Sequence, residues 1–225
     1  MNTKAVRDLM NSFPGGIFTW SYLAILLACI IILLSGSKPD THLAINSFHS
    51  PFLDTLLKNW THLADGIILI LLLATLSLVS FRVFFTGTAA VIFGGLAAQF
   101  IKHVFFPHSP RPVKYFELHQ ISEQLNLIPG VEMHTWLSFP SGHTATAFAL
   151  FFSLALSVRS QALRLLFFIL AAGVGLSRIY LSQHFLIDVL GGSVLGMLMG
   201  WLAWRIFNAI NKEWINKNLY SAYKK

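Results

Sequence analysis

Three short motifs between residues 102 and 188 hold most of the side chains in this sequence that could do chemistry. The first contains Lys102 and Arg111-Pro112, the second is Pro140-Ser141-Gly142-His143, and the third runs from Ser177-Arg178 to His184 and Asp188. Together they supply three permanent cations, two imidazoles, one carboxylate and a Ser-Gly turn. Cations hold phosphate oxygens, and an activated histidine can attack phosphorus. The residue types therefore predict phosphate binding and phosphoryl transfer.

The spacing within the second and third motifs divides this chemistry between two histidines. His184 and Asp188 are four residues apart, which puts them on one helix face, where the carboxylate can fix the imidazole tautomer. Ser141 and Gly142 directly precede an apolar run and read as a helix start, with Ser141 as the N-cap. Such a start offers free N–H groups to an anion. The second motif therefore predicts an anion site with His143 beside it.

Two of the cations and the carboxylate also lie at similar distances from the ends of apolar segments. Lys102, Arg178 and Asp188 each lie about one helical turn from the end of such a segment, so we expect three helices to bring charge to one level. Snorkelling explains a single Lys or Arg but does not explain Asp188. Arg111 lies in a polar loop, where its planar fork can grip two phosphate oxygens.

The segments that position these motifs indicate a membrane protein. Of 225 residues, 55% are hydrophobic and 11% are charged, whereas a soluble domain is about 25% charged. Six stretches approach the length of about 20 residues that a spanning helix needs: 17–34, 66–85, 87–106, 142–158, 162–181 and 185–207. The sequence therefore predicts an all-α bundle of six transmembrane helices, forming one domain over residues 1–225.

Charge distribution predicts how this bundle is oriented. Six spans place both termini on one side, and ten of the 16 Lys and Arg fall on that side. The positive-inside rule then makes both termini cytoplasmic and turns the motifs towards the periplasm or the outside of the cell. The first span, preceded by basic residues, is expected to stay as an uncleaved anchor. The net charge of +7 thus reflects topology, since no basic stripe interleaved with aromatics indicates nucleic-acid binding.

Metal chemistry has little support in the sequence. There is no His-Glu-x-x-His run and no set of cysteine ligands, because Cys29 is the only cysteine. We therefore predict no metal and no cofactor. The other histidines are interpreted as interfacial or loop residues, namely His42, His49, His62, His103, His108, His119 and His134. The polar loop over 107–141 is expected to form a short helix or a lid over the site.

The three motifs resemble the signature of the type 2 phosphatidic acid phosphatase superfamily, which includes vanadium haloperoxidases and glucose-6-phosphatase. The second and third motifs match in full, whereas eight residues separate Lys102 from Arg111 and family members often have six. The resemblance implies a nucleophilic His184, an orienting Asp188 and a general acid, His143. It implies that the phosphate is bound by Lys102, Arg111, Ser141, Gly142 and Arg178.

The resemblance also implies a bacterial inner-membrane enzyme that hydrolyses a lipid phosphomonoester or diphosphate through a phosphohistidine, without a metal. The substrate classes are undecaprenyl diphosphate, phosphatidylglycerol phosphate, phosphatidate and lipid A. Its partners would be the bilayer and the phosphorylated lipid, with no obligate protein partner indicated. Two alternatives stay open. One is a lipid phosphotransferase with the same phosphoenzyme, and the other is a non-enzymatic carrier of phospholipids, which would not need both histidines and Asp188.

Overall fold

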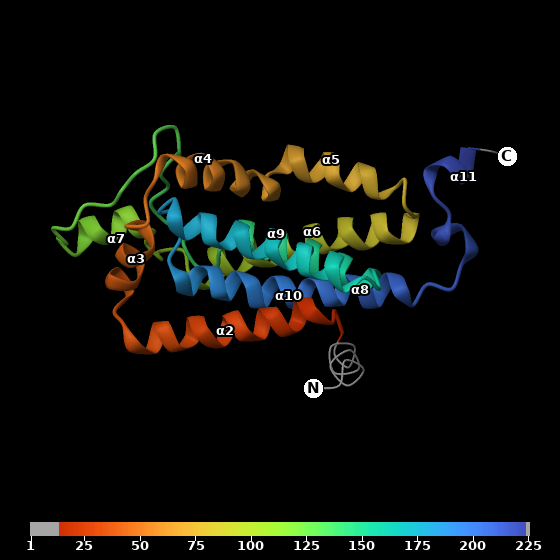
Figure 1. Ribbon diagram of the computed structural model, residues 1–225, viewed down its shortest axis with the longest axis horizontal. Coiled ribbons are helices and arrows are strands. Elements are labelled where there is room, and N and C mark those ends of the chain that lie inside the picture. The colour runs from red at the N-terminus through yellow and green to blue at the C-terminus, as the bar shows by residue number, and fades with distance from the viewer. Residues whose placement is uncertain (1–13, 224–225) are drawn as a thin grey trace.

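The computed structural model describes residues 14–223, and these residues form helices and loops with no strand. The helices are α2 (Ile17–Ser35), α3 (Lys38–Asn46), α4 (Pro51–Trp60), the 3-10 helix η1 (Thr61–Ala64), α5 (Gly66–Leu76), α6 (Phe81–Phe105), α7 (Pro112–Leu118), α8 (Gly142–Ser157), α9 (Gln161–Tyr180), α10 (Leu186–Asn208), the 3-10 helix η2 (Glu213–Asn216) and α11 (Leu219–Tyr223). The long helices form an elongated bundle (Figure 1). The predicted all-α class is confirmed, while residues 1–13 and 224–225 of the predicted domain, with both termini, lie outside the described part.

Within residues 14–223, four helices are long and apolar enough to cross a membrane, namely α2, α6, α9 and α10. The segment from α4 through α5 is a fifth candidate if it counts as one span, although it bends by 61° between Ala64 and Gly66. Helix α8 has 16 residues and is shorter than the candidate spans. The helices thus agree with a multi-span membrane protein, and the count of six spans stays a prediction.

The boundary between the second and third predicted spans was wrong. The sequence predicts one span over 66–85 and the next over 87–106, which leaves only residue 86 for the turn, but α5 ends at Leu76 and α6 begins at Phe81. Ser80 sets this start, because its side chain accepts a hydrogen bond from an N–H in the first turn of α6. Gly87 lies within α6, where an added Cβ would approach leucine side chains of α5 and α8 to 3.1–3.2 Å. It allows close helix packing rather than a turn.

Helix α8 lies at the centre of the bundle, in contact with α6, α9 and α10. Every residue over 144–155 is buried. Phe148 and Phe152 of α8 pack against Phe18 of α2, which also meets Phe168 of α9 edge to face. Interlocking aromatic rings of this kind add to the burial of apolar surface. The second motif is therefore built on the best-buried helix of the bundle.

Helices α8 and α10, which carry the second motif and part of the third, touch along their backbones. Gly192, Gly196 and Gly200 repeat at four-residue intervals along one face of α10. An added Cβ at these positions would lie 2.4–2.5 Å from carbonyl oxygens of α8, those of Ser141, Ala145 and Ala149. Small residues at such intervals let two helices approach closely. This contact brings the starts of the two helices together, and the Ser141 N–H donates to the Asp188 carbonyl oxygen at 2.9 Å.

Both ends of the described chain lie at the end of the bundle remote from the motifs. Gly16 is beside the Arg164 side chain at the start of α9. The Leu219 N–H donates to the Ser77 carbonyl oxygen in the turn after α5, at 3.0 Å. At the opposite end, α3, α7 and the loop that follows α7 gather around the motifs (left in Figure 1).

Candidate active site

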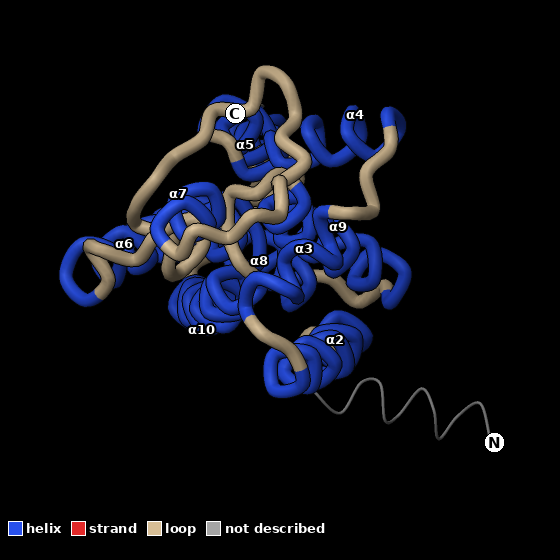
Figure 2. The backbone as a smooth tube through the Cα atoms, turned by 90° about the vertical axis from the view of Figure 1, so that its left-hand side faces the viewer, coloured by secondary structure: helices blue, strands red, loops and turns tan. Residues whose placement is uncertain are grey.

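The structure brings all eight residues predicted from the motifs to one end of the bundle, where α6 and α9 end and α8 and α10 begin. Four ionisable members are largely withdrawn from solvent: Lys102 is 4% exposed, Arg178 7%, and His184 and Asp188 1% each. Helices α3 and α7 and the loops beside them lie in front of this end of the bundle in Figure 2. Buried charge at this density is unusual unless it serves binding or catalysis.

The loop between α9 and α10 folds back on α9 and is held by α3. The Arg178 carbonyl oxygen accepts the His184 N–H at 3.0 Å. Ser182 adopts a φ of 53°, and its Oγ lies 3.1 Å from His42 Nε2 and 3.3 Å from Asn46 Nδ2, both in α3. His42 is thus a buried residue that supports the loop, which corrects its prediction as an interfacial or loop residue.

Asp188 lies beside His184 but is bonded to other groups. Its Oδ2 is 3.6 Å from His184 Nδ1, too long for a hydrogen bond. The same oxygen accepts the Ser138 hydroxyl at 2.5 Å and the Phe185 N–H at 2.9 Å. Among the described residues, His184 Nδ1 has no hydrogen-bond partner. The carboxylate is therefore held in place next to the ring, and the tautomer-fixing bond expected from the four-residue spacing is not formed in this structure.

The three cations approach His184 from separate elements. Lys102, near the end of α6, donates from Nζ to the Leu137 carbonyl oxygen at 2.5 Å. Arg111, which immediately precedes α7, donates from Nε to the Trp136 carbonyl oxygen at 3.0 Å. Arg178 comes from the last turn of α9. Despite its unusual distance from Arg111 in the sequence, Lys102 thus reaches the same cluster.

The charges around His184 keep its imidazole neutral. Burial, reinforced by the positive charges of Arg111, Lys102 and Arg178, lowers the pKa of His184 well below its usual value of about 6.5. A neutral ring has a free lone pair for attack on phosphorus. The site therefore combines positive charge, which suits an anion, with an imidazole that has a free lone pair at neutral pH.

Gln183 is a residue of the site that the sequence analysis missed. Its Oε1 accepts hydrogen bonds from the guanidinium groups of Arg111 and Arg178, each at 3.3 Å. Its Nε2 donates to the Glu132 carbonyl oxygen at 2.8 Å. One oxygen between two guanidinium groups marks a position that suits an oxygen of an anion. The only signal in the sequence was its place directly before His184.

The start of α8 is left open on its outer side. Ser141 occupies the predicted N-cap position, but its side chain accepts no bond from the helix N–H groups. Its Oγ instead accepts the Thr144 hydroxyl at 2.9 Å. A Cβ added to Gly142 would meet no atom within 4 Å. The first N–H groups of α8 therefore stand next to open space, an arrangement that favours an anion.

Asp65 pairs with His143 and was also missed. Its Oδ1 lies 2.8 Å from His143 Nε2, and its Oδ2 lies 2.5 Å from His62 Nδ1. Asp65 sits at the break between η1 and α5, so the bend in this segment carries the carboxylate to the site. Although Asp65 contacts two imidazoles, no set of three or more His, Cys, Asp or Glu side chains within residues 14–223 has the arrangement of a metal site. The sequence did offer one signal for Asp65, because it is a carboxylate at the start of an apolar segment, as Asp188 is.

Comparison with known proteins decides the family. The model of the PAP2 superfamily matches residues 83–212, more than half of the chain and a range that includes all three motifs. The chain belongs to the PAP2 superfamily. The resemblance suggested by the motifs is thereby confirmed.

This PAP2 protein is similar in sequence to parts of two other proteins. A lipid A 1-phosphatase from Porphyromonas gingivalis is 40% identical over 78 residues, which cover 34% of this chain and 18% of the relative. A phosphatidylglycerophosphatase B from Bacillus subtilis is 38% identical over 74 residues, covering 29% of this chain and 36% of the relative. The matches therefore span well under half of either relative. Both are named as phosphatases of lipids.

Solved structures show the same PAP2 fold. The crystal structure of Aquifex aeolicus LpxE superimposes with a TM-score of 0.64 at 26% identity, covering 77% of this chain and 98% of that one. A transmembrane PAP2-type phosphatidylglycerolphosphate phosphatase from Bacillus subtilis gives a TM-score of 0.50 at 20% identity, with 89% and 98% covered. The second likeness concerns the fold alone. Both likenesses agree with the helical fold of this chain.

Proposed function

We propose that this PAP2 protein is a membrane lipid phosphatase that hydrolyses a lipid phosphomonoester or diphosphate through a phosphohistidine. The observation that carries the proposal is the set of three cations, Arg111, Lys102 and Arg178, whose charges all act on the buried imidazole of His184. Fixed cations stabilise the charge of a phosphoryl group in transfer. A phosphate held among them would lie against the nucleophile.

In the first step His184 attacks and the lipid leaves. With Nδ1 facing Asp188, Nε2 is the nitrogen that forms a bond to phosphorus while the phosphorus–oxygen bond to the lipid breaks. Asp188 stabilises the positive ring that results. His143 Nε2 faces Asp65, so His143 Nδ1 gives its proton to the departing oxygen.

In the second step water regenerates the enzyme. His143, now neutral, takes a proton from a water molecule that attacks the phosphohistidine. The nitrogen–phosphorus bond breaks, inorganic phosphate forms, and His184 returns to its neutral state. The hydrogen bond to Asp65 orients the His143 ring, and the negative charge of Asp188 beside His184 favours the positively charged phosphohistidine between the two steps.

The substrate and the side of the membrane belong to the same proposal. The names of the two relatives favour lipid A and phosphatidylglycerol phosphate as headgroup classes, and undecaprenyl diphosphate and phosphatidate complete the panel. With six spans, ten of the 16 Lys and Arg fall on the side of the termini, which supports a cytoplasmic placement of that side. The site then serves the outer leaflet of the inner membrane from the periplasm.

Phosphate release from defined lipids by the purified protein tests this function. We expect release from at least one class, no release and no labelled phosphoenzyme with His184→Ala, and unchanged rates in EDTA. Loss of His143 should cost about 10²–10⁴-fold with a lipid alcohol and much less with p-nitrophenol as leaving group. Label on His184→Ala but none on His143→Ala would reverse the two roles. Transfer of label to a second lipid, instead of release, would make the protein a phosphotransferase.

A further inference from the structure

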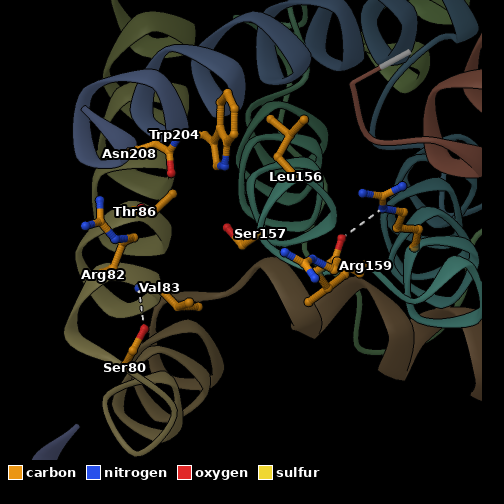
Figure 3. A pocket seen from close by; sticks show the side chains of 11 residues that line it. Ser80, Arg82, Val83, Thr86, Leu156, Ser157, Arg159, Trp204 and Asn208 are labelled. Atoms are coloured by element: carbon orange, nitrogen blue, oxygen red, sulfur yellow. Dashed lines mark hydrogen bonds between the residues drawn. The ribbon is translucent and has the colours of Figure 1, made fainter. Parts of the chain in front are cut away.

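A second cationic pocket lies at the opposite end of the bundle. It has a volume of about 450 Å³ and is formed where α6 and α9 begin and α8 and α10 end. Figure 3 shows residues of these helix ends around it. Lys102 is 20 residues along α6 from Arg82, which lines the pocket, so the pocket and the candidate active site are about 30 Å apart. The pocket is thus separate from the phosphatase site.

Three arginines and no carboxylate line this pocket: Arg82, Arg159 and Arg164. Two of them are fixed by hydrogen bonds. Arg82 donates to three oxygens, those of the Phe207 and Ile210 main chain and the Asn216 side chain. Arg164 donates from Nε to the last carbonyl oxygens of α8, those of Ala155 and Val158. The framework of the pocket therefore has two positive charges at set positions before any ligand arrives.

Arg159 is the member with unused donors. It is exposed, and its side chain has no hydrogen-bond or ion-pair partner among residues 14–223. It comes two residues after the last residue of α8, and in Figure 3 its side chain extends towards Ser157. A guanidinium group presents five N–H donors in a planar fork that matches phosphate oxygens. Arg159 is therefore free to close on an anion held near Arg82 and Arg164.

The remaining walls combine polar and apolar surface. Ser80 and Ser157 contribute hydroxyl groups, while Val83, Leu156 and Trp204 contribute apolar surface. Tryptophan at the end of a spanning helix is typical of the level at which lipid headgroups lie. A ligand with a charged head and apolar chains would satisfy both kinds of wall. A small free anion would use the arginines alone.

We propose that this pocket binds the phosphate of an anionic phospholipid headgroup in the leaflet opposite the one that the active site serves. Basic pockets between spanning helices favour such headgroups through charge and hydrogen bonding. The proposal does not depend on the phosphatase function, since the two sites share no residue. If these arginines only set the orientation of the protein in the membrane, they would favour anionic over zwitterionic lipid no more than any other surface cation does.

Lipid retention by the purified full-length protein tests the proposal. Native mass spectrometry and thermal unfolding are followed while phosphatidylglycerol, phosphatidylcholine or inorganic phosphate is titrated. We expect phosphatidylglycerol to be retained and to raise the unfolding temperature more than the other two. Arg159→Gln should weaken its retention about fivefold, the effect of one cation near anionic lipid, while Arg159→Lys should retain most of it.

The matched control is Arg205→Gln. Arg205 is an exposed cation in the last turn of α10, at the same end of the bundle, where it lies over the Trp201 ring outside the pocket. Equal losses for Arg159→Gln and Arg205→Gln would reduce the effect to surface charge and overturn the pocket. Equal effects of inorganic phosphate and phosphatidylglycerol would overturn the lipid assignment. Hydrolysis of a soluble phosphate ester should be unchanged in Arg159→Gln, which shows that the variant folds.

Discussion

At the scale of single residues, the two histidines of the site have carboxylate neighbours of different kinds. Asp188 is buried with His184 and stands 3.6 Å from its ring, held by donors of its own. Asp65 contacts His143 at 2.8 Å, and both side chains are about one third exposed. A buried neutral ring suits a nucleophile, whereas a ring near water can exchange the protons that a general acid needs. The two rings therefore differ in their access to water, as the proposed division of roles requires.

Asp65 should act through His143. Asp65→Asn is expected to lower the turnover of a lipid substrate about tenfold, less than the ~10²–10⁴-fold range for losing a general acid outright. The rate with p-nitrophenyl phosphate should hardly change, because its leaving group needs no proton. Kinetics with both substrates measure this difference. His62→Gln is the control, since it removes the other imidazole on Asp65. Equal losses with both substrates would show that Asp65 is structural.

The pH profile should report the charge around His184. Its lowered pKa keeps the ring neutral, so the acid limb of kcat/KM is expected well below pH of about 6.5, the usual histidine value. Arg111→Gln removes a positive charge that disfavours the protonated ring. The pKa should therefore rise and the limb should move to higher pH. Arg111→Lys keeps the charge, so its limb should stay while the rate falls with the loss of the fork. A common shift in both variants would contradict the electrostatic account.

At the scale of elements, the glycine row of α10 is what aligns the two motif-bearing helices. A Cβ at Gly196 would lie 2.5 Å from the Ala145 carbonyl oxygen, so the helices must move apart to admit it. Gly196→Ala should lower the stability of the protein by about 1–3 kcal/mol and reduce turnover, because the starts of α8 and α10 separate.

Thermal unfolding and activity of Gly196→Ala are to be compared with Gly95→Ala. Gly95 lies in α6, and an added Cβ there would meet only Thr146 Oγ1, at 3.8 Å. Alanine favours a helix over glycine by about 1 kcal/mol at either position. Gly95→Ala should therefore be neutral or stabilising. Similar behaviour of the two variants would show that the helix contact tolerates a methyl group.

At the scale of the whole molecule, the bundle has two chemically distinct ends. Seven of the nine acidic residues in the sequence fall between Asp40 and Asp188, in elements at the motif end. The opposite end is basic and receives both ends of the described chain. Reporter insertions in the turn over 77–80 and at Arg159 should therefore report cytoplasm, and an insertion near Glu123 should report periplasm. The reverse pattern would place the site on the cytoplasmic face.

The sequence by itself determined the helical class, the family and the eight motif residues. These follow from local properties: apolar run length, residue type and short spacing at helix ends. Its errors were local as well. The apolar run continues past Leu76, so only the cap at Ser80 revealed where α6 begins. The four-residue spacing of His184 and Asp188 gave proximity, but one of the donors that hold the carboxylate, the Ser138 hydroxyl, is 50 residues away in the sequence.

Only the tertiary structure decided which other side chains complete the site. Asp65 is 78 residues from His143, and Gln183 meets Arg111 across 72 residues. The glycine contact that aligns α8 with α10 joins residues about 50 apart. Each depends on helix packing and on the bend after Ala64. Periodicity describes the face that a helix presents, whereas the partner of that face is chosen by close packing among all the helices.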